Sequence, residues 1–211
     1  MLFDFAKVPP EQAYKLIVSS VVPRPVAWVV SQDREGRINA APYSFFNAFS
    51  SNPVVVGIGC GQRPPGVVKD TLANIEATGQ FVVNLVSAEN AAQMNITAID
   101  FPHGVDELAE AGLTTAPSSV VKVPRIAESP VALECEIFQF VPTGHHTIVM
   151  GRVVAMHVRD DCVQDASRFY LDTPKMGLVG RMHGGGWYAR TTDRVEIPRI
   201  PRAEWEARAK G

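Results

Sequence analysis

Cysteine is scarce in this chain, and its positions exclude the usual uses of paired cysteines. The three residues, Cys60, Cys135 and Cys162, are odd in number and far apart, and no Cys-x-x-Cys motif occurs. We therefore expect no disulfide framework, with each thiol reduced and buried as a small apolar side chain. Reduced thiols favour a cytoplasmic protein.

Long apolar runs and an excess of charge of one sign are also missing. No apolar stretch approaches the ~18 residues that a membrane-spanning helix needs, and the first residues carry Asp4 where a signal peptide would be apolar. The 20 Lys and Arg residues against 22 Asp and Glu give a net charge of −2, with the arginines scattered. Nucleic-acid binders usually gather a basic excess on one face. We expect neither a membrane nor a nucleic-acid partner.

Several motifs of well-known enzyme classes are absent as well. GIGCG (57–61) has the glycines of a dinucleotide loop, but prolines follow it where that loop needs a helix. His145, His146 and His183 form no metal-ligand pattern, so no metal is expected. No Gly-x-Ser-x-Gly elbow or close pair of acids indicates hydrolysis. His146 beside a redox cofactor could still orient a substrate or carry a proton.

The hydrophobic pattern predicts one mainly β domain over residues 1–211. An Asp33–Gly36 turn makes 24–45 a hairpin, and Gly79 ends the helix over 68–78. Sequential hairpins indicate an antiparallel β-barrel with helices outside it. The expected strands are 24–31, 53–61, 81–87, 131–141 and 147–158, and the expected helices are 11–20, 68–78, 88–98, 105–111 and 202–210.

Four short segments in a fixed order carry the chemistry: RPVAWVVS (24–31), NAAPYSFFNAFSS (39–51), KDT (69–71) and FVVNLV (81–86). They combine apolar strands, a loop rich in amide and hydroxyl groups, and a cation with a hydroxyl at a helix start. A flat aromatic ligand with a phosphate needs an apolar slot, donors along its edge and positive charge at its tail.

Each of these features also has a purely structural interpretation. Asp70 could cap the helix while Lys69 is solvated, and Trp28 could be a core aromatic residue. The segment 42–51 could be a ligand wall or an edge strand whose phenylalanines fill the barrel. The glycines of 184–186, followed by Trp187, indicate either a flap with aromatic contacts or a surface loop.

Taken together, the segments make the chain resemble the flavin reductase-like family of FMN-binding split-barrel proteins over about residues 14–195. GHHTIVMGRV (144–153) is similar to a later family element, G-D-H-T-x-x-x-G-x-V, and 181–188 to its C-terminal loop. The resemblance implies an antiparallel Greek-key split β-barrel with peripheral α-helices, leaving a C-terminal arm at 196–211.

The resemblance also implies a cofactor site. FMN would contact Trp28 and the 44–48 loop with its ring, while Ser50, Lys69 and Thr71 hold its phosphate. His146 would stand where the nicotinamide or another substrate approaches. The loop residues concerned are Ser44, Phe46, Asn47 and Ala48.

The function that the resemblance implies is oxidoreduction, with hydride passing from NADH or NADPH to flavin N5. His145 stands where the family often has Asp, which leaves the choice of nicotinamide open. The family's homodimers suggest a homodimer here, acting on a small-molecule substrate or with a partner oxygenase. The alternative is an FMN-holding electron carrier without a nicotinamide site.

Overall fold

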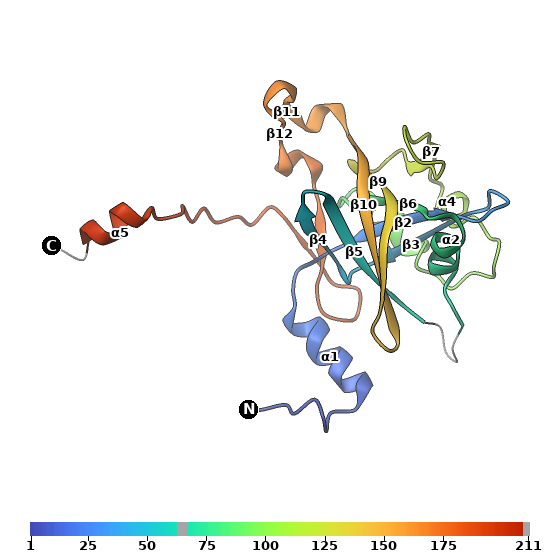
Figure 1. Ribbon diagram of the computed structural model, residues 1–211, viewed down its shortest axis with the longest axis horizontal. Helices are drawn as coiled ribbons and strands as arrows, with labels where there is room; N and C mark the ends of the chain where they lie inside the picture. The colour runs from blue at the N-terminus through green and yellow to red at the C-terminus, as the bar shows by residue number, and fades with distance from the viewer. Residues whose placement is uncertain (63–66, 209–211) are drawn as a thin grey trace.

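The computed structural model describes residues 1–62 and 67–208 and is built around one seven-stranded antiparallel sheet (Figure 1). Its hydrogen-bonded order is β3-β2-β6-β9-β10-β5-β4. The strands are β2 (Ala27–Gln32), β3 (Ile38–Tyr43), β4 (Phe46–Ser51), β5 (Val54–Gly61), β6 (Gln80–Leu85), β9 (Val131–Pro142) and β10 (His146–Val158).

The two edge strands of this sheet, β3 and β4, are consecutive in the chain and are linked by Ser44 and Phe45 alone. Two residues cannot span a flat seven-stranded sheet, so the sheet must curl until its edges approach each other. Among the described residues β3 and β4 do not pair, and the barrel stays open. The antiparallel, mainly β prediction is confirmed, whereas a closed barrel and Greek-key order are not established.

Smaller elements surround the sheet. A three-stranded sheet joins β1 (Arg24–Pro25), β13 (Val179–Arg181) and β14 (Tyr188–Arg190), and two short ribbons lie elsewhere. The ribbons pair β7 (Thr115–Ala116) with β8 (Arg125–Ile126) and β11 (Val163–Asp165) with β12 (Tyr170–Leu171). The α-helices are α1 (Pro10–Ser20), α2 (Asp70–Thr78), α3 (Ala91–Ile96), α4 (Glu107–Glu110) and α5 (Arg202–Arg208). Short 3₁₀ helices lie at Asp160–Cys162, Ala166–Arg168 and Thr173–Met176.

Both faces of the sheet are covered by apolar packing. Trp28 and Val30 belong to one cluster and their neighbour Val29 to the other, because successive side chains of a strand point to opposite faces. Helix α2 covers the second cluster with Leu72 and Ile75. Buried strands of this kind explain the apolar runs in the sequence.

The helix predicted over 11–20 is α1 to within one residue, whereas the next three helix predictions were right in place and too long in extent. Gly79 ends α2 with φ 72°, as predicted, whereas α2 begins at Asp70 rather than at residue 68. Helices α3 and α4 are a turn or so each, shorter than the predicted 88–98 and 105–111. Asp106 caps α4 through the N–H groups of Leu108 and Ala109, which sets its start.

The segment 42–51 is the end of β3, a bend at Ser44 and Phe45, and then the edge strand β4. The edge-strand interpretation is therefore correct, but Phe49 is 62% exposed and does not fill the interior. The glycines of GIGCG make room for this edge. A Cβ on Gly57 would lie 2.6 Å from Cε2 of Phe49, so the ring lies directly over that residue.

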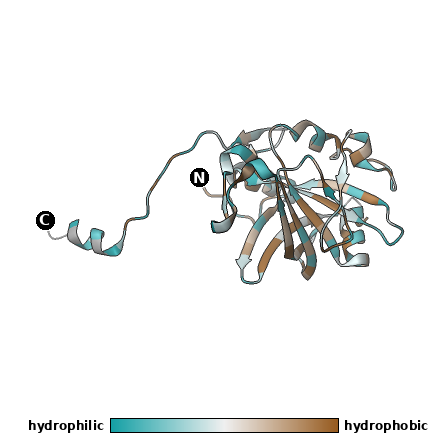
Figure 2. Ribbon diagram, turned by 90° about the horizontal axis from the view of Figure 1, so that it is seen from above, coloured by the Kyte–Doolittle hydropathy of each residue, from teal (hydrophilic) through white to brown (hydrophobic). Residues whose placement is uncertain are grey.

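The tail beyond β14 runs away from the sheet and ends in α5 (Figure 1). Figure 2 shows apolar residues concentrated in the strands of the sheet, away from this tail. The predicted tail helix over 202–210 is present to Arg208, and its last two residues lie outside the described part of the chain.

The three cysteines are all free and buried, as predicted. Burial raises the pKa of the Cys60 thiol to about 12, so this residue remains a neutral thiol. Within residues 1–62 and 67–208, no cluster of three metal-ligating side chains occurs. The described helices include none with the length and apolarity needed to cross a membrane.

Candidate flavin site

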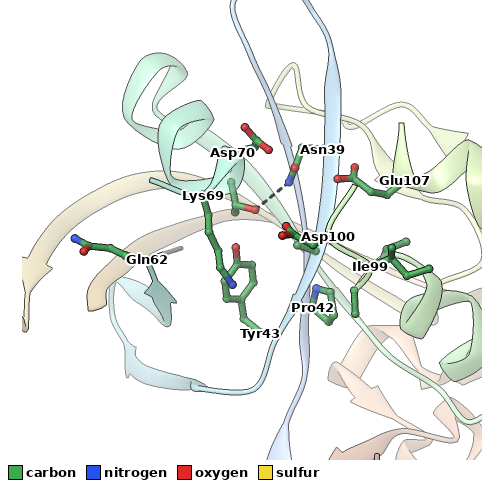
Figure 3. Close-up of a pocket in the computed structure, with 13 residues that line it drawn as sticks. Asn39, Pro42, Tyr43, Gln62, Lys69, Asp70, Ile99, Asp100 and Glu107 are labelled. Carbon is green, nitrogen blue, oxygen red and sulfur yellow. Dashed lines mark hydrogen bonds between the residues drawn. The ribbon is translucent and has the colours of Figure 1, made fainter. Parts of the chain in front are cut away.

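A cavity of about 350 Å³ opens where the start of α2 meets β3 (Figure 3). Lys69 is the residue before α2, and its Nζ lies 5.6 Å from the centroid of the Tyr43 ring. No carboxylate among the described residues forms an ion pair with this ammonium group. The cavity thus holds a cation that rests on an aromatic face. Its other lining residues are Asn39, Ala41, Pro42, Gln62, Asp70, Thr71, Thr97, Ala98, Ile99, Asp100 and Glu107.

The first turn of α2 has no side-chain cap. The purely structural interpretation predicts Asp70 as the cap, but Lys69 occupies the cap position, and an ammonium group cannot accept a hydrogen bond from the helix N–H groups. Oδ1 of Asp70 lies 2.9 Å from Nδ1 of His103. A helix start whose N–H groups lack side-chain partners carries a partial positive charge and attracts anions.

Thr71 is fully buried in a polar network with Asn39 and Glu107. We assign the Asn39 amide with its oxygen toward Thr71, because this orientation gives both ends of the amide a partner. The Thr71 hydroxyl then donates to Oδ1 of Asn39 at 2.9 Å, and Nδ2 of Asn39 donates to Oε1 of Glu107 at 3.2 Å. Oε2 of Glu107 accepts from the N–H of Ala40 at 2.9 Å. These bonds tie the first turn of α2 to β3 and α4, so the network holds the wall of the cavity in one geometry.

Burial raises the pKa of Glu107, although the N–H of Ala40 acts in the opposite direction. The nearby carboxylates of Asp70 and Asp106 raise it further. Of the described residues lining the cavity, one is a lysine and three carry carboxyl groups. The cavity is therefore suited to one anion beside Lys69, together with hydroxyl groups that donate to the acids.

Trp28 lies beneath this cavity rather than in it. Its side chain is fully buried within the first apolar cluster, and Nε1 donates to Oγ1 of Thr97 at 2.9 Å. Thr97 itself lines the cavity. In this chain the indole has no surface to offer a ring, so the core-aromatic interpretation describes it and its influence on a ligand passes through Thr97.

A second cavity, of about 340 Å³, lies over β5 and brings together Phe46, Asn47 and His146. The imidazole of His146 stacks on Phe45 with ring centroids 5.8 Å apart and planes 28° apart. Its other lining residues are Phe49, Gly57, Gly59, Thr143 and Ile148, so the walls are mainly apolar. Such a slot suits a planar ring.

The two cavities are lined by residues close together in the chain, and the charge in the first affects a side chain in the second. Tyr43 lines the first and Phe45 the second, with only Ser44 between them. Burial lowers the pKa of His146, and the charge of Lys69 lowers it further. An imidazole with a lowered pKa is neutral at pH 7, and the effect of Lys69 places the ammonium within electrostatic range of the ring.

Three predicted residues lie elsewhere. Ser44 lines a third cavity, and Ala48 and Ser50 are exposed on β4 without lining any of the three. Ser50 pairs with Val55, five residues along β5 from Cys60, whose thiol lies near Lys69. At about 3.3 Å per residue this separation is roughly 16 Å along the strand, so Ser50 and Lys69 lie toward opposite ends of β5.

Sequence reasoning missed Asn39, Tyr43 and Glu107 as cavity residues. Asn39 and Tyr43 lie inside the quoted NAAPYSFFNAFSS segment, and their role could have been suspected from it. Glu107 has no local signal, because only the fold brings α4 beside β3.

A model of the family described as "Flavin reductase like domain" matches residues 18–174. The chain belongs to the flavin reductase-like family. Membership of this family makes the protein a flavin-related oxidoreductase.

Relatives cover nearly the whole chain. A protein of Deinococcus radiodurans is 43% identical over 208 residues, which is 97% of this chain and 92% of that protein. The crystal structure of nitrilotriacetate monooxygenase component B from Bacillus cereus has a TM-score of 0.88 at 30% identity, covering 93% of this chain and 98% of that one. That of Pseudomonas fluorescens 2-nitrobenzoate 2-nitroreductase has a TM-score of 0.86 at 34% identity, covering 96% and 97%.

Proposed function

We propose that this flavin reductase-like protein binds FMN and passes electrons from NADH or NADPH to a small-molecule acceptor. One observation carries the proposal: the ammonium of Lys69, which has no carboxylate partner among the described residues, and the start of α2, which has no side-chain cap, lie beside an apolar slot that contains His146. The first pair of features suits a phosphate, and the slot suits a flat ring.

The residues present fit the cofactor. Lys69 and the N–H groups of α2 would hold the phosphate, while Thr71 and Asn39 keep that turn in place. Phe46 and Asn47 would line the ring side, and Ser44 the passage between cavities. A bound flavin would supply the redox chemistry, accepting hydride from the nicotinamide.

His146 would act on the substrate side as a neutral group. Its lowered pKa keeps the imidazole uncharged near pH ~7, so it can donate or accept a hydrogen bond. A neutral ring would also not repel the nicotinamide, which becomes cationic once it has given up its hydride. Its stacking on Phe45 fixes the ring at the edge of the slot. The partner choice stays open, since relatives include a monooxygenase component and a nitroreductase.

The cations of the first cavity favour FMN over FAD. Lys69 is the one lysine or arginine among the described lining residues, so it can compensate one phosphate, whereas FAD would bring a second. We expect FMN to bind at least about tenfold more tightly than FAD, a difference of about 1.4 kcal/mol. Isothermal titration with each flavin measures it, and equal affinities would contradict this assignment.

A homodimer would complete the site. Ala48 and Ser50 lie on the exposed edge strand β4, where a second copy rather than the same chain could present them to a flavin. We propose that the contribution expected from these two residues is made across a subunit interface.

The visible spectrum of the purified protein, with and without added FMN, tests the cofactor. Anaerobic addition of NADH or NADPH then tests the donor, with loss of the flavin absorbance near ~450 nm as the expected result. FMN binding without bleaching would support the electron-carrier alternative. A protein that takes up no FMN would refute the proposal.

A further inference from the structure

A third cavity, of about 240 Å³, lies between α1, β1 and the β13–β14 hairpin. It shares Pro42 and Ala98 with the Lys69 cavity, so the two adjoin. Its lining is basic, unlike that of the Lys69 cavity, because two arginines line it and no carboxylate among the described residues does. The remaining lining residues are Tyr14, Val18, Val26, Ser44, Asn95, His183, Gly184 and Tyr188.

Arg24 is the buried cation of this cavity, only 6% exposed. Its Nη1 donates to the carbonyls of Val18 and Val21, both at 2.7 Å, and Nη2 to that of Met182 at 2.8 Å. Its Nε has no acceptor among the described residues. These carbonyls orient the guanidinium and tie the end of α1 to the hairpin, but they are neutral, and no described carboxylate forms an ion pair with Arg24.

Arg181 is the accessible cation. Its guanidinium lies 4.8 Å from the Tyr188 ring centroid, and Nη1 donates to the Tyr188 hydroxyl at 2.7 Å. Its remaining donors bond to none of the described residues. A guanidinium held on an aromatic face, with donors to spare, is a preorganised fork for a carboxylate or phosphate.

The two charges act on each other. Burial lowers the pKa of Arg24, and the charge of Arg181 lowers it further. Two uncompensated cations in one cavity repel each other, and an oxyanion between them would relieve that repulsion. A purely structural role explains Arg24, which fastens α1, but it does not explain why Arg181 lines the same cavity.

We propose that this arginine cavity is a second oxyanion site, which recognises a carboxylate or phosphate on the molecule that exchanges electrons with the flavin. The last clause rests on the proposed function, whereas the anion site stands on Arg24 and Arg181 alone. At about 240 Å³ the cavity is smaller than the ~300–1,000 Å³ of typical ligand pockets, so it admits a benzoate-sized group or one end of a longer molecule.

Arg24 lies inside the family match, whereas the accessible side of this site lies beyond it. That match ends at residue 174, before Arg181, His183 and Tyr188. The hairpin that carries them is joined to the family core through β1, where Arg24 pairs with Arg181. The site therefore joins Arg24 of the matched region to Arg181 of the hairpin that follows it.

The test compares Arg181→Gln with Arg190→Gln in the full-length protein. Both change one arginine of the same hairpin, but Arg190 is exposed and does not line the cavity. Benzoate, nicotinamide mononucleotide and FMN are titrated separately into flavin-free protein by calorimetry. We expect benzoate or the mononucleotide to bind the parent protein, and Arg181→Gln to weaken that binding about tenfold or more. Arg190→Gln and FMN affinity should each change less than about twofold.

The outcomes separate the possibilities. Weakened benzoate binding alone assigns the oxyanion to an acceptor carboxylate, and weakened mononucleotide binding alone assigns it to the donor's phosphate; both support the site. Loss of FMN affinity in Arg181→Gln would overturn it, because the cavity would then belong to the flavin. No saturable anion binding to the parent would also overturn it, even if FMN binds. If Arg181→Gln fails to fold, Arg181→Lys takes its place, because lysine keeps the charge but cannot present the planar fork of a guanidinium. Arg181→Lys should bind the anion more weakly than the parent protein, and an affinity equal to that of the parent would overturn the fork.

Discussion

Lys69 shows how one residue acquires meaning from its surroundings. A lysine before a helix is commonplace in sequences, but here it lies over Tyr43 and beside a helix start without a side-chain cap. Thr71 adds rigidity rather than a free hydroxyl, because its Oγ1 is already committed to Asn39. The phosphate assignment therefore depends mainly on Lys69 and the α2 backbone.

Replacing Lys69 with Ala should weaken FMN binding by about 1.5–3 kcal/mol, as expected for the loss of a charge-assisted hydrogen bond. Quenching of flavin fluorescence on binding measures the affinity. Lys122→Ala, which removes an exposed lysine from another loop, is the matched control and should leave it unchanged. Unaltered FMN affinity in Lys69→Ala would mean that the phosphate lies elsewhere.

Glu134 is a buried charge that serves the fold. It is fully buried and accepts the N–H groups of Ser119, Val120 and Val121, and Nε2 of His157 lies 2.5 Å from Oε1. Burial alone would raise the pKa of Glu134. The N–H of Ser119, the His157 side chain and the other two N–H groups outweigh that effect and lower the pKa to about 2.

Glu134→Gln should lower the free energy of unfolding by about 1–3 kcal/mol at neutral pH, because an amide cannot accept all these bonds. A pKa lower in the folded than in the unfolded state means that the stabilisation is present above about pH 4.5 and is lost as the pH falls toward about 2. Urea unfolding between about pH 2 and about pH 7 measures both effects, because this range covers the titration of carboxyl groups. A parent and variant that lose stability in parallel across this window would contradict the assignment.

At the scale of elements, glycines decide how closely the strands and rings approach. Gly151 in β10 faces Phe81 of β6, and a Cβ there would lie 2.9 Å from Cε1 of Phe81 and 3.1 Å from Cβ of Cys135. Phe81 and Cys135 are fully buried, so neither can move aside into solvent. The register of β9 against β10 also shifts next to Gly151, which indicates a local irregularity there.

Gly151→Ala should therefore destabilise the fold by about 1–3 kcal/mol through overpacking, even though alanine is the smallest possible change. Thermal unfolding followed by circular dichroism gives the difference. Gly184→Ala is the control, because a Cβ at that position meets nothing within 4 Å. If both variants melt at the parent temperature, the contact between β10 and Phe81 is looser than described.

For the whole molecule, the exposed apolar residues raise the question of assembly. Phe49 and Val54 on the β4–β5 edge are 62% and 46% exposed, and Val195 and Ile197 in the tail are 82% and 83% exposed. An edge strand with exposed apolar side chains is a natural surface for pairing with another chain. This surface adjoins the slot lined by Phe46 and His146, which agrees with the proposed flavin site near a subunit interface.

We predict that the protein sediments as a dimer of about twice 22.9 kDa, and that Phe49→Arg raises the dimer dissociation constant about tenfold or more by placing a charge in the interface. Phe169→Arg is the matched control, since that phenylalanine is 90% exposed and lies far along the chain beside β12. Sedimentation velocity across a concentration series distinguishes them. A monomeric parent protein would refute the prediction.

Much of this architecture was predictable because its signals are local. Apolar β-branched runs predicted β5, β6, β9 and β10 within one or two residues, and Gly79 predicted the end of α2, since only backbone conformation and burial are involved. The short helices were predicted too long, because their ends depend on tertiary contacts. The ordered motifs also indicated the flavin reductase-like family, which the family match confirms.

What the sequence by itself determined is the long strands, the buried thiols and the family, because these follow from side-chain polarity and motif order read along the chain. Only the tertiary structure decided that Trp28 lies under the cavity, that Glu107 joins Asn39 and Thr71, and that Ser50 stands apart from Lys69. It also decided that Arg24 and Arg181, distant in sequence, line one cavity. The curling of the sheet brings such residues together, and no local pattern of amino acids encodes that approach.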